Sequence, residues 1–382
     1  MDRKLKAGVI GLGLLGTSHS TYLAQHPKVE FVAGVDVREQ AANEAKAKFG
    51  IQVYSDYDAM LAAGGLDLAV VATPDPLHKD PVIACARAKI PYIVVEKPLA
   101  TTVADGQEML AACQAGGSSL WVHLNNRVNP MDIAARYIIQ EGLLGAVAYG
   151  EARLDDNISV PRRLWGKRSR DWAAASSTAY FLLSHTSDTM RWLFEPAEVE
   201  AVYAITQHKV LGYSPDLYDA YLFFNTGLRI RVKADWIKYM EGLVEYYKCF
   251  SGDKGTLIYN KIPGFNVKEA SLQANFDEMP FAQLLEHQEA LKARGARVHA
   301  RMLEPRSSIG GGLMPQLEMD AQQPPATRLM DHILNSIFEG KPVPGSWAGN
   351  GRLPTGEDGL AQTKIVCAII ESANKRQEVL IA

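Results

Sequence analysis

The segment KAGVIGLGLLG, residues 6–16, decides the fold of this chain. Its first five residues form a short, mostly apolar run that predicts a buried strand. Gly11, Gly13 and Gly16 follow at the spacing G-x-G-x-x-G, and a helical pattern continues through Gln25. A glycine turn between a strand and a helix at this spacing is typical of a dinucleotide-binding unit.

A second apolar run, Val29–Val35, ends at Asp36, twenty residues beyond the last glycine of the turn. A carboxylate at that distance hydrogen-bonds an adenosine ribose and repels a 2′-phosphate, while the helix N-terminus offers N–H groups to the pyrophosphate. We therefore predict a site for NAD, with NADP as the alternative because Arg38 could soften the repulsion. The predicted contacts are Gly11, Leu12, Gly13, Leu14, Leu15, Gly16, Asp36, Val37 and Arg38.

Strand and helix patterns alternate through residue 124. Apolar runs at 66–72, 90–95 and 119–124 alternate with helical patterns at 81–88 and 103–115. This alternation predicts a parallel sheet with helices on both faces, which binds ligands at the carboxyl ends of its strands. Two strands end in Thr73-Pro74 and in Glu96-Lys97-Pro98, so both segments belong to the edge where a nicotinamide would lie.

Composition and length limit the possible classes of protein. The 382 residues are too many for one typical core, and a net charge of −3 gives no reason to expect nucleic acid or an anionic membrane as a partner. The four cysteines form no C-x-x-C pair, which argues against a zinc site or a disulfide framework, and we predict no metal. With neither a signal peptide nor an apolar run of ~18 residues, we expect a cytoplasmic protein.

Motifs along nearly the whole chain resemble the Gfo/Idh/MocA (glucose–fructose oxidoreductase / inositol dehydrogenase) family. The motifs are VIGLGLLG (9–16), ATPDPLH (72–78), VVEKPLA (94–100), NNRVNP (125–130) and TGEDGL (355–360). The resemblance implies an α/β protein with a Rossmann domain at 1–124. It further implies an α/β domain at 125–382 that binds substrate and carries a large, mostly antiparallel sheet. That sheet often forms the dimer interface in the family, so a homodimer or homotetramer is expected.

The second half of the chain agrees with this fold on its own patterns. Strand-like runs at 199–208, 218–224, 228–236, 246–250 and 256–259 precede helical patterns at 328–338 and 359–372. Asn225-Thr226-Gly227 predicts a hairpin turn. Between these parts, the stretch 281–325 contains GGGLMPQLEMDAQQPP, which we interpret as irregular. A lid and an oligomer arm are both possible roles for it.

The resemblance also implies which residues react and which hold the cofactor. Lys97 matches a family lysine that serves the sugar hydroxyl during hydride transfer, and burial would lower the pKa of its amine. The Lys97–Pro98 bond is commonly cis in the family. His185, within YFLLSHTSDTMRWLF (180–194), matches a family histidine. Thr73, Pro74, His78, Glu96 and Lys97 are the predicted contacts at the nicotinamide edge.

One position departs from the family pattern. Many members carry an aspartate four residues before the histidine, where this chain has Phe181. A phenyl ring cannot accept a hydroxyl proton, so either Lys97 and His185 suffice, another residue substitutes, or the chemistry differs. Asp188 could reach the same helix face as His185, or it could be a structural residue tied to Arg191 or to a backbone group.

The predicted substrate contacts are drawn from both halves of the chain: Lys97, Asn126, Arg127, Arg163, Trp165, Phe181, His185 and Asp188. Five basic residues lie within 162–170 beside two tryptophans, which fits either an anionic or multiply hydroxylated substrate or a solvated loop. The leading hypothesis is an NAD-dependent dehydrogenase acting on a sugar, inositol or related polyol. The alternatives are a lyase or glycosidase that works through transient oxidation, and a non-catalytic nucleotide-binding regulator.

Overall fold

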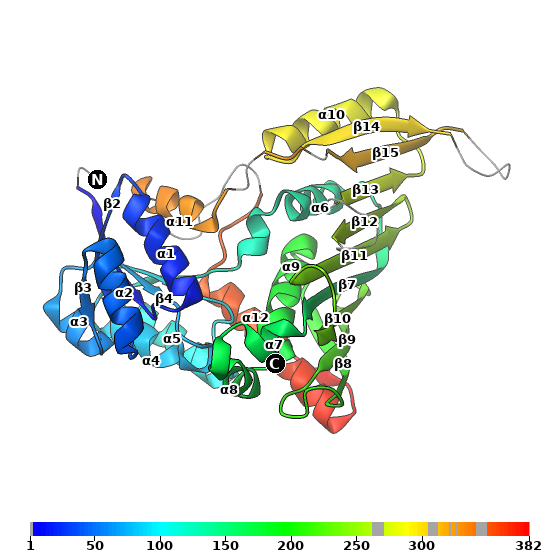
Figure 1. The fold of residues 1–382 in the computed structure, drawn as a ribbon. Helices are drawn as coiled ribbons and strands as arrows, with labels where there is room; N and C mark the ends of the chain where they lie inside the picture. The colour runs from blue at the N-terminus through cyan, green and yellow to red at the C-terminus, as the bar shows by residue number, and fades with distance from the viewer. Residues whose placement is uncertain are drawn as a thin grey trace. The chain divides into compact units, whose positions relative to one another are not determined.

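The computed structural model describes residues 3–261, 271–304, 312–320, 322–324, 327–340 and 350–381. Packing divides the chain into two compact units. Among the described residues, the first unit comprises 3–124, 332–340 and Leu353–Lys364, and the second comprises the remainder (Figure 1). Two late segments thus pack with the first unit, and the predicted domain boundaries at 124/125 stay a prediction.

The first unit is built on a six-stranded parallel sheet in the order β3-β2-β1-β4-β5-β6. Its strands are β1 (Leu5–Ile10), β2 (Val29–Val35), β3 (Gln52–Tyr54), β4 (Leu68–Val71), β5 (Tyr92–Val95) and β6 (Ser119–Val122). Its helices are α1 (Leu14–Gln25), α2 (Glu39–Phe49), α3 (Tyr57–Ala63), α4 (Lys79–Arg87) and α5 (Val103–Gly116). Because the strand order reverses between β1 and β4, ligands are expected at the carboxyl ends of these strands.

Local sequence explains where these elements begin and end. The four residues of β4 are fully buried, as expected for a parallel strand covered on both faces. Thr102 caps α5 through its hydroxyl, which accepts a hydrogen bond from the backbone N–H of Asp105. Gly50 ends α2 in the left-handed conformation, at φ 66°. The predicted Rossmann fold is confirmed.

The second unit contains a ten-stranded sheet in the order β14-β15-β13-β12-β11-β7-β10-β9-β8-β16. The first six strands in the chain are β7 (Val147–Asn157), β8 (Val199–Gln207), β9 (Leu217–Phe224), β10 (Arg229–Lys238), β11 (Val244–Gly252) and β12 (Gly255–Lys261). The others are β13 (Ser271–Phe276), β14 (Val298–Leu303), β15 (Met314–Met319) and β16 (Val379–Leu380). Only the β7–β10 pair is parallel among those described, so the prediction of a mostly antiparallel sheet is confirmed.

Helices and helical turns complete the second unit (Figure 1). They are η2 (Asn125–Val128), α6 (Pro130–Gln140), α7 (Ser159–Arg163), η3 (Gly166–Arg168), α8 (Ser169–Ala175), the π-helical turn η4 (Ala179–Leu183), α9 (Ser184–Phe194) and α10 (Phe281–Ala293). Two further helices, α11 (Leu329–Phe338) and α12 (Gly356–Lys375), each have residues in both units. Among the described helices, none combines the length and apolar character needed to cross a membrane.

The interpretation of GGGLMPQLEMDAQQPP as irregular is wrong for its central part. Met314–Met319 forms β15, which pairs with both β13 and β14, and α10 precedes this pair of strands. The sequence did not predict this strand because it contains Pro315 and follows several glycines, and both residue types are depleted from sheet interiors. Leu317 lies opposite Ala274 and Ala300, and its complete burial shows that tertiary packing overrides local propensity here.

Candidate functional site

The glycine turn has the geometry that its sequence predicts. Gly11 has φ 89°, a value that side chains other than glycine rarely adopt. A Cβ placed on Gly16 would lie 1.7 Å from the carbonyl oxygen of Gly11, so this position accepts no side chain while the turn keeps its shape. A Cβ on Gly13 would meet nothing closer than the Arg38 guanidinium, at 3.8 Å. Gly13 therefore leaves open space over the N-terminus of α1.

Asp36 is fixed at the end of β2 by the neighbouring backbone and by Arg38. Its Oδ2 accepts the N–H of Leu12 at 2.9 Å, and its Oδ1 accepts the backbone N–H of Arg38, also at 2.9 Å. The Arg38 guanidinium adds two donors, at 2.9 and 2.8 Å. Asp36 is buried, so the carboxylate is held in place beside the glycine turn where the ribose is expected.

Three apolar side chains around this turn are exposed. Leu14 is 58% exposed, Leu15 39%, and Val37 88%. Leu14 and Leu15 begin α1, and Val37 follows Asp36 directly. Large apolar groups gathered at one site often mark a ligand surface, and here they flank the predicted dinucleotide position.

The loops at the ends of β4 and β5 are joined by His78. Its buried ring lies between two backbone carbonyl oxygens, 2.7 Å from that of Pro98 and 3.0 Å from that of Thr73. The Lys97–Pro98 bond is cis, as the resemblance implies, and Lys97 is buried. His78 thus ties together the two loops that contain Thr73, Pro74 and Lys97, which all follow strand ends.

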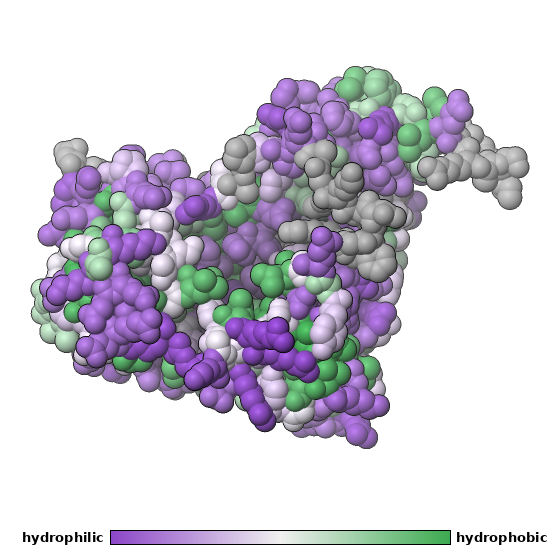
Figure 2. Space-filling model, viewed as in Figure 1, coloured by the Kyte–Doolittle hydropathy of each residue, from purple (hydrophilic) through white to green (hydrophobic). Residues whose placement is uncertain are grey.

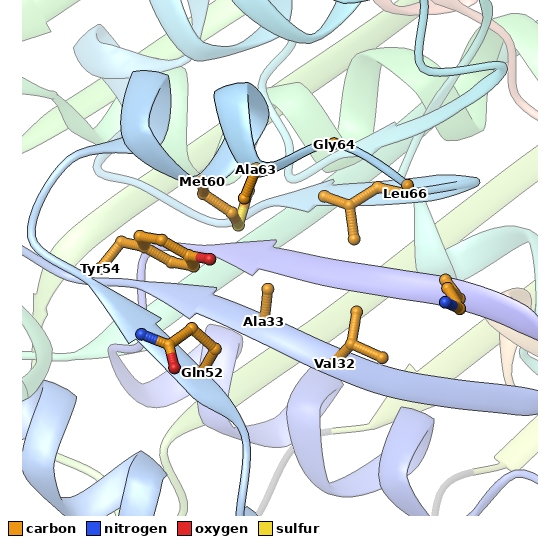
Figure 3. Close-up of a pocket in the computed structure, with 10 residues that line it drawn as sticks. Val32, Ala33, Gln52, Tyr54, Met60, Ala63, Gly64 and Leu66 are labelled. Carbon is orange, nitrogen blue, oxygen red and sulfur yellow. The ribbon is translucent and has the colours of Figure 1, made fainter.

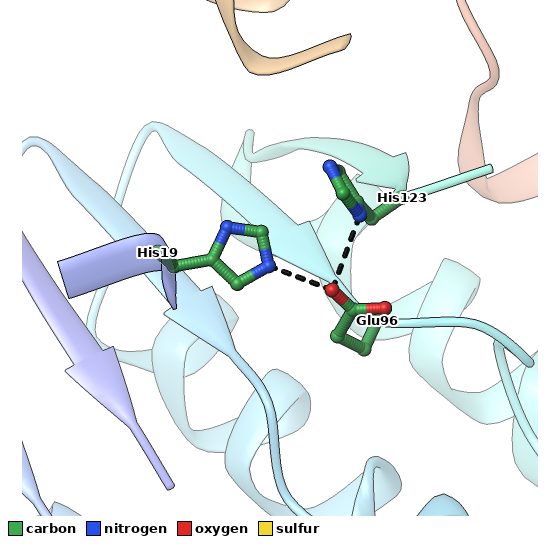
Figure 4. A group of neighbouring side chains, drawn as sticks. All are labelled: His19, Glu96 and His123. Carbon is green, nitrogen blue, oxygen red and sulfur yellow. Dashed lines mark hydrogen bonds and ion pairs between the residues drawn. The ribbon is translucent and has the colours of Figure 1, made fainter. Parts of the chain in front are cut away.

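Glu96 holds two histidines from distant parts of the sequence (Figure 4). Its Oε1 accepts from Nε2 of His19 at 2.6 Å and from Nδ1 of His123 at 3.1 Å. The two imidazole rings meet edge to face, with centroids 4.7 Å apart. Burial alone would raise the pKa of Glu96, but the charge and hydrogen bonds of His123 and His19 hold it well below its ordinary value.

Two imidazoles and one carboxylate are also a set of transition-metal ligands, with ligand atoms within 4.8 Å of one another. The separations do not favour that assignment. Zinc–ligand bonds of about 2.0–2.1 Å place tetrahedral ligands about 3.3 Å apart, whereas His19 Nε2 lies 2.6 Å from Glu96 Oε1. We therefore assign His19, Glu96 and His123 as a hydrogen-bonded triad next to Lys97.

Glu96→Gln should make the free energy of unfolding less dependent on pH in the acidic range. Because the folded-state pKa of Glu96 is depressed, its contribution is present above the ordinary value of 4.5 and is lost as pH falls through the folded value. Denaturant unfolding across this range should show a stability difference from wild type that shrinks toward low pH. Glu44→Gln, on the exposed side of α2, is the control. A difference independent of pH would refute the assignment.

In the second unit, His185 lies in the first turn of α9 and is half-buried. Asp188, one turn later, forms a buried ion pair with Arg127 through two hydrogen bonds of 3.0 and 2.5 Å. Arg191 pairs instead with Glu198. The structural alternative for Asp188 is thus supported, although its partner is Arg127 from η2.

Phe181 belongs to a cluster of four aromatic rings. Its ring centroid lies 4.8 Å from that of Trp172 and 6.0 Å from that of Trp236, and Trp165 contacts Trp172 edge to face at 5.6 Å. Trp236 is fully buried, while the other three rings are partly exposed. We call these four residues the aromatic cluster. At position 181 the chain therefore has an apolar ring surface instead of a carboxylate.

The basic segment, residues 162–170, runs through α7, η3 and the start of α8. Its five cations are Arg162, Arg163, Lys167, Arg168 and Arg170, all exposed, and none is ion-paired to another described residue. Figure 2 shows hydrophilic residues gathered over α7 and α8. Arg170 stacks over the ring of Tyr213 at 4.9 Å, and Arg162 donates to the hydroxyl of Tyr239 at 3.3 Å.

A pocket of about 220 Å³ lies on the first unit between β2, β3 and α3 (Figure 3). Its lining includes Val32, Ala33, Tyr54, Met60 and Leu66. Among the described residues of this lining, none is a predicted cofactor, substrate or catalytic residue. The pocket lies against the middle of β2 rather than at its carboxyl end. It therefore does not coincide with the predicted cofactor site.

Sequence reasoning missed the two histidines of the triad. His19 follows Gly16 by three residues on α1, and His123 follows the last residue of β6. The one available signal was that β6 ends at the same edge of the sheet as β5. It places a side chain after β6 near Glu96 but does not select histidine or identify its partner on α1.

Curated relatives match part of the chain. The D-apiose dehydrogenase of Paraburkholderia graminis is 34% identical over 149 residues, which are 39% of this chain and 40% of that protein. The inositol 2-dehydrogenase of Acidothermus cellulolyticus is 30% identical over 226 residues, 58% of this chain and 62% of that protein. A 2,7-anhydro-N-acetylneuraminate hydratase of Escherichia coli is 32% identical over 141 residues, 37% of each chain. These matches span less than two thirds of each relative.

Solved structures match the chain over its full length. The WlbA dehydrogenase of Bordetella pertussis, crystallised with NADH and UDP-GlcNAcA, superposes with a TM-score of 0.75 at 24% identity, covering 100% of this chain and 99% of that one. A levoglucosan dehydrogenase in complex with NADH and levoglucosan gives a TM-score of 0.73 at 22% identity, with 99% and 100% covered. At these identities the likeness establishes the fold.

Two family models match consecutive parts of the chain. Residues 5–124 match the NAD-binding Rossmann fold of an oxidoreductase family, and residues 133–258 match the GFO/IDH/MocA C-terminal domain. The first match covers the glycine turn, Asp36 and the Glu96-Lys97-Pro98 segment, and the second covers β7–β11 together with α9. The chain belongs to the Gfo/Idh/MocA family of NAD-binding oxidoreductases.

Proposed function

We propose that this protein is an NAD-dependent dehydrogenase that oxidises a hydroxyl group of a sugar, an inositol or a related polyol. The observation that carries the proposal is the placement of Lys97. It is a buried amine two residues beyond the end of β5, at the edge of the sheet where Gly11, Gly13 and Asp36 would hold a dinucleotide. A general base is needed there because loss of hydride from a carbinol carbon accompanies loss of the hydroxyl proton.

The site residues of the first unit bind the cofactor or take part in proton transfer in this proposal. The N–H groups at the start of α1 receive the pyrophosphate, and Asp36 receives a ribose hydroxyl. NAD, when bound, supplies the hydride acceptor. Lys97 Nζ takes the proton from the reacting hydroxyl, and the triad of His19, Glu96 and His123 fixes the backbone that precedes Lys97. His185 orients the hydroxyl or joins the proton relay.

A second candidate function has a specific observation in its favour. Phe181 replaces the carboxylate that many family dehydrogenases carry, and one relative that matches part of the chain is named as a hydratase. In this alternative, transient oxidation by bound NAD activates the sugar for elimination or hydration, with no net NADH. The same catalytic lysine would serve both reactions, so the products distinguish them.

The test is a panel of sugars, inositols and sugar acids, with NADH followed by absorbance and products by mass spectrometry, and with NADP in parallel. We expect at least one panel member to be oxidised with NAD and more slowly with NADP, because Asp36 disfavours a 2′-phosphate. A modified sugar without NADH accumulation would favour the second candidate. Tight NAD binding with no chemistry on any member would refute both and leave a regulator.

The basic segment bears on the substrate class. Five exposed cations within nine residues repel one another, and an anionic ligand would offset this repulsion. The Arg163 guanidinium presents donors suited to a carboxylate or phosphate, and Trp165 lies beside it in sequence. We propose that acidic sugars have the lower KM, and that this KM rises with ionic strength while that of a neutral sugar does not.

We also propose a homodimer or homotetramer formed through the large sheet. One face of the sheet carries a row of partly exposed side chains in register on six successive strands: Tyr203, Tyr221, Arg231, Glu151, Cys249 and Ile258. Tyr149, 44% exposed, extends it. Sedimentation should give two or four times the chain mass of 41.9 kDa, and a monomer at micromolar concentration would refute the proposal.

A further inference from the structure

The carboxylate of Asp36 accepts four hydrogen bonds in this structure. Oδ2 receives the backbone N–H of Leu12 and one arm of the Arg38 guanidinium, and Oδ1 receives the backbone N–H and the Nε–H of Arg38, all at 2.8–2.9 Å. A carboxylate has about four lone-pair positions. With these four donors in place, the group proposed to bind the adenosine ribose has no position left for a ribose hydroxyl.

Two of the four donors are fixed by the fold, and the guanidinium is not. The N–H of Leu12 belongs to the glycine turn, and the N–H of Arg38 belongs to the residue that precedes α2. The guanidinium is carried by a flexible side chain that is 38% exposed, whereas the Asp36 side chain is 6% exposed. An ion pair that is open to solvent on one side contributes little to stability and breaks readily. The guanidinium is therefore the donor that a ribose hydroxyl would displace.

The guanidinium also borders the space proposed for the pyrophosphate. Its Nη2 donates to Asp36 and lies 3.8 Å from the position that a Cβ on Gly13 would take. This is the open space over the N-terminus of α1, whose N–H groups suit a phosphate. The same side chain thus occupies acceptor positions on Asp36 and stands beside the glycine turn.

We propose, on the basis of the dehydrogenase function inferred above, that Arg38 competes with the adenosine ribose for Asp36 and thereby sets the cofactor specificity of the chain. For NAD, the guanidinium must leave Asp36 before the ribose hydroxyl binds, so the apparent affinity is reduced by the fraction of molecules in which it has left. For NADP, the same guanidinium is a ligand, because its planar fork matches a phosphate and offsets the charge of Asp36. Arg38 thus opposes one cofactor and supports the other.

Removal of the guanidinium should therefore have opposite effects on the two cofactors. In Arg38→Ala the two backbone donors still hold Asp36, and its other acceptor positions are open to the ribose. We expect the Kd for NAD to fall by about three- to tenfold, as it would if the guanidinium occupied Asp36 about 70–90% of the time. The Kd for NADP should rise by at least about tenfold. Titration calorimetry with each cofactor, without substrate, measures both values.

Three further variants separate competition from a general effect of charge. Arg87→Ala removes an exposed guanidinium from the last turn of α4 and should leave both Kd values unchanged. In an Asp36→Ala background the guanidinium has lost the carboxylate for which it competes, so adding Arg38→Ala should not tighten NAD binding. In Arg38→Lys an ammonium keeps the charge but lacks the planar fork, so NAD should bind more tightly than in wild type while NADP still finds a cation.

Three results would overturn the inference: an Arg38→Ala variant whose Kd for NAD equals or exceeds that of wild type, one whose Kd for NADP is unchanged, and a tightening that persists in the Asp36→Ala background. If Arg38→Ala has a lowered Tm, Arg38→Lys decides, and an unchanged Kd for NAD in that variant overturns the inference as well. Failure of the proposed function looks different. Wild type would then turn over no panel member, whereas the binding measurements, made without substrate, would be unaffected.

Discussion

Replacing Lys97 with alanine is expected to lower kcat by about 10³-fold while NAD binds as in wild type. General acid–base groups contribute about 10²–10⁴-fold to enzymatic rates, and a buried amine at the end of β5 has few substitutes. NAD affinity should be kept because the described contacts that shape the dinucleotide site come from the glycine turn and Asp36. Steady-state kinetics and fluorescence titration with NADH measure the two quantities separately.

The lysine variant needs a control for a change of charge on the first unit. Lys46→Ala removes an exposed amine from α2 and should leave both kcat and NAD affinity unchanged. Lys97→Arg adds a second comparison, because a guanidinium keeps the positive charge but does not act as a base near neutral pH. If Lys97→Ala turns over near the wild-type rate, Lys97 is not the base and the proposed mechanism is wrong.

The fold of the first unit could be predicted because its signals are local. A strand, a glycine turn, a helix and an acid succeed one another within the first 36 residues, and each of the three glycines has a separate steric reason. The strand that leads to Lys97 could be predicted for the same reason, because a short apolar run is followed at once by charged residues. Local physics therefore fixed both the sheet and the edge at which it binds ligands.

The parts that sequence did not predict depend on contacts between distant segments. His19, Glu96 and His123 come from α1, the end of β5 and the end of β6, and no spacing rule joins them. β15 was not predicted because Pro315 lowers the strand propensity of its sequence. Its stability comes from pairing with β13 and β14.

Alanine substitutions at Gly13 and Gly16 should have different effects, although both glycines belong to one motif. The change at Gly16 should lower stability, whereas the change at Gly13 should weaken NAD binding alone. Gly16→Ala places a methyl group 1.7 Å from the Gly11 carbonyl oxygen, an overlap that α1 relieves only by moving away from β1. We expect a destabilisation of about 3 kcal/mol or more, seen as a lower Tm together with loss of NAD binding.

Gly13→Ala should give the opposite combination. Gly13 has φ −72°, which alanine adopts freely, and the new methyl group would meet only the Arg38 guanidinium at 3.8 Å. The Tm of the free protein should therefore match wild type. The methyl group would nevertheless occupy the space through which a pyrophosphate approaches the backbone, so the Kd for NAD should rise by about 30–100-fold, a loss of about 2–3 kcal/mol.

The pair tests the cofactor site more sharply than either variant alone. If Gly13→Ala keeps both its Tm and its NAD affinity, the open space over α1 is not the pyrophosphate site, and the Rossmann turn of this chain holds its ligand elsewhere. If Gly16→Ala is as stable as wild type, the close contact with Gly11 is absent in solution. Only a stable Gly13 variant with weak binding, beside an unstable Gly16 variant, supports the geometry from which the role of Lys97 is argued.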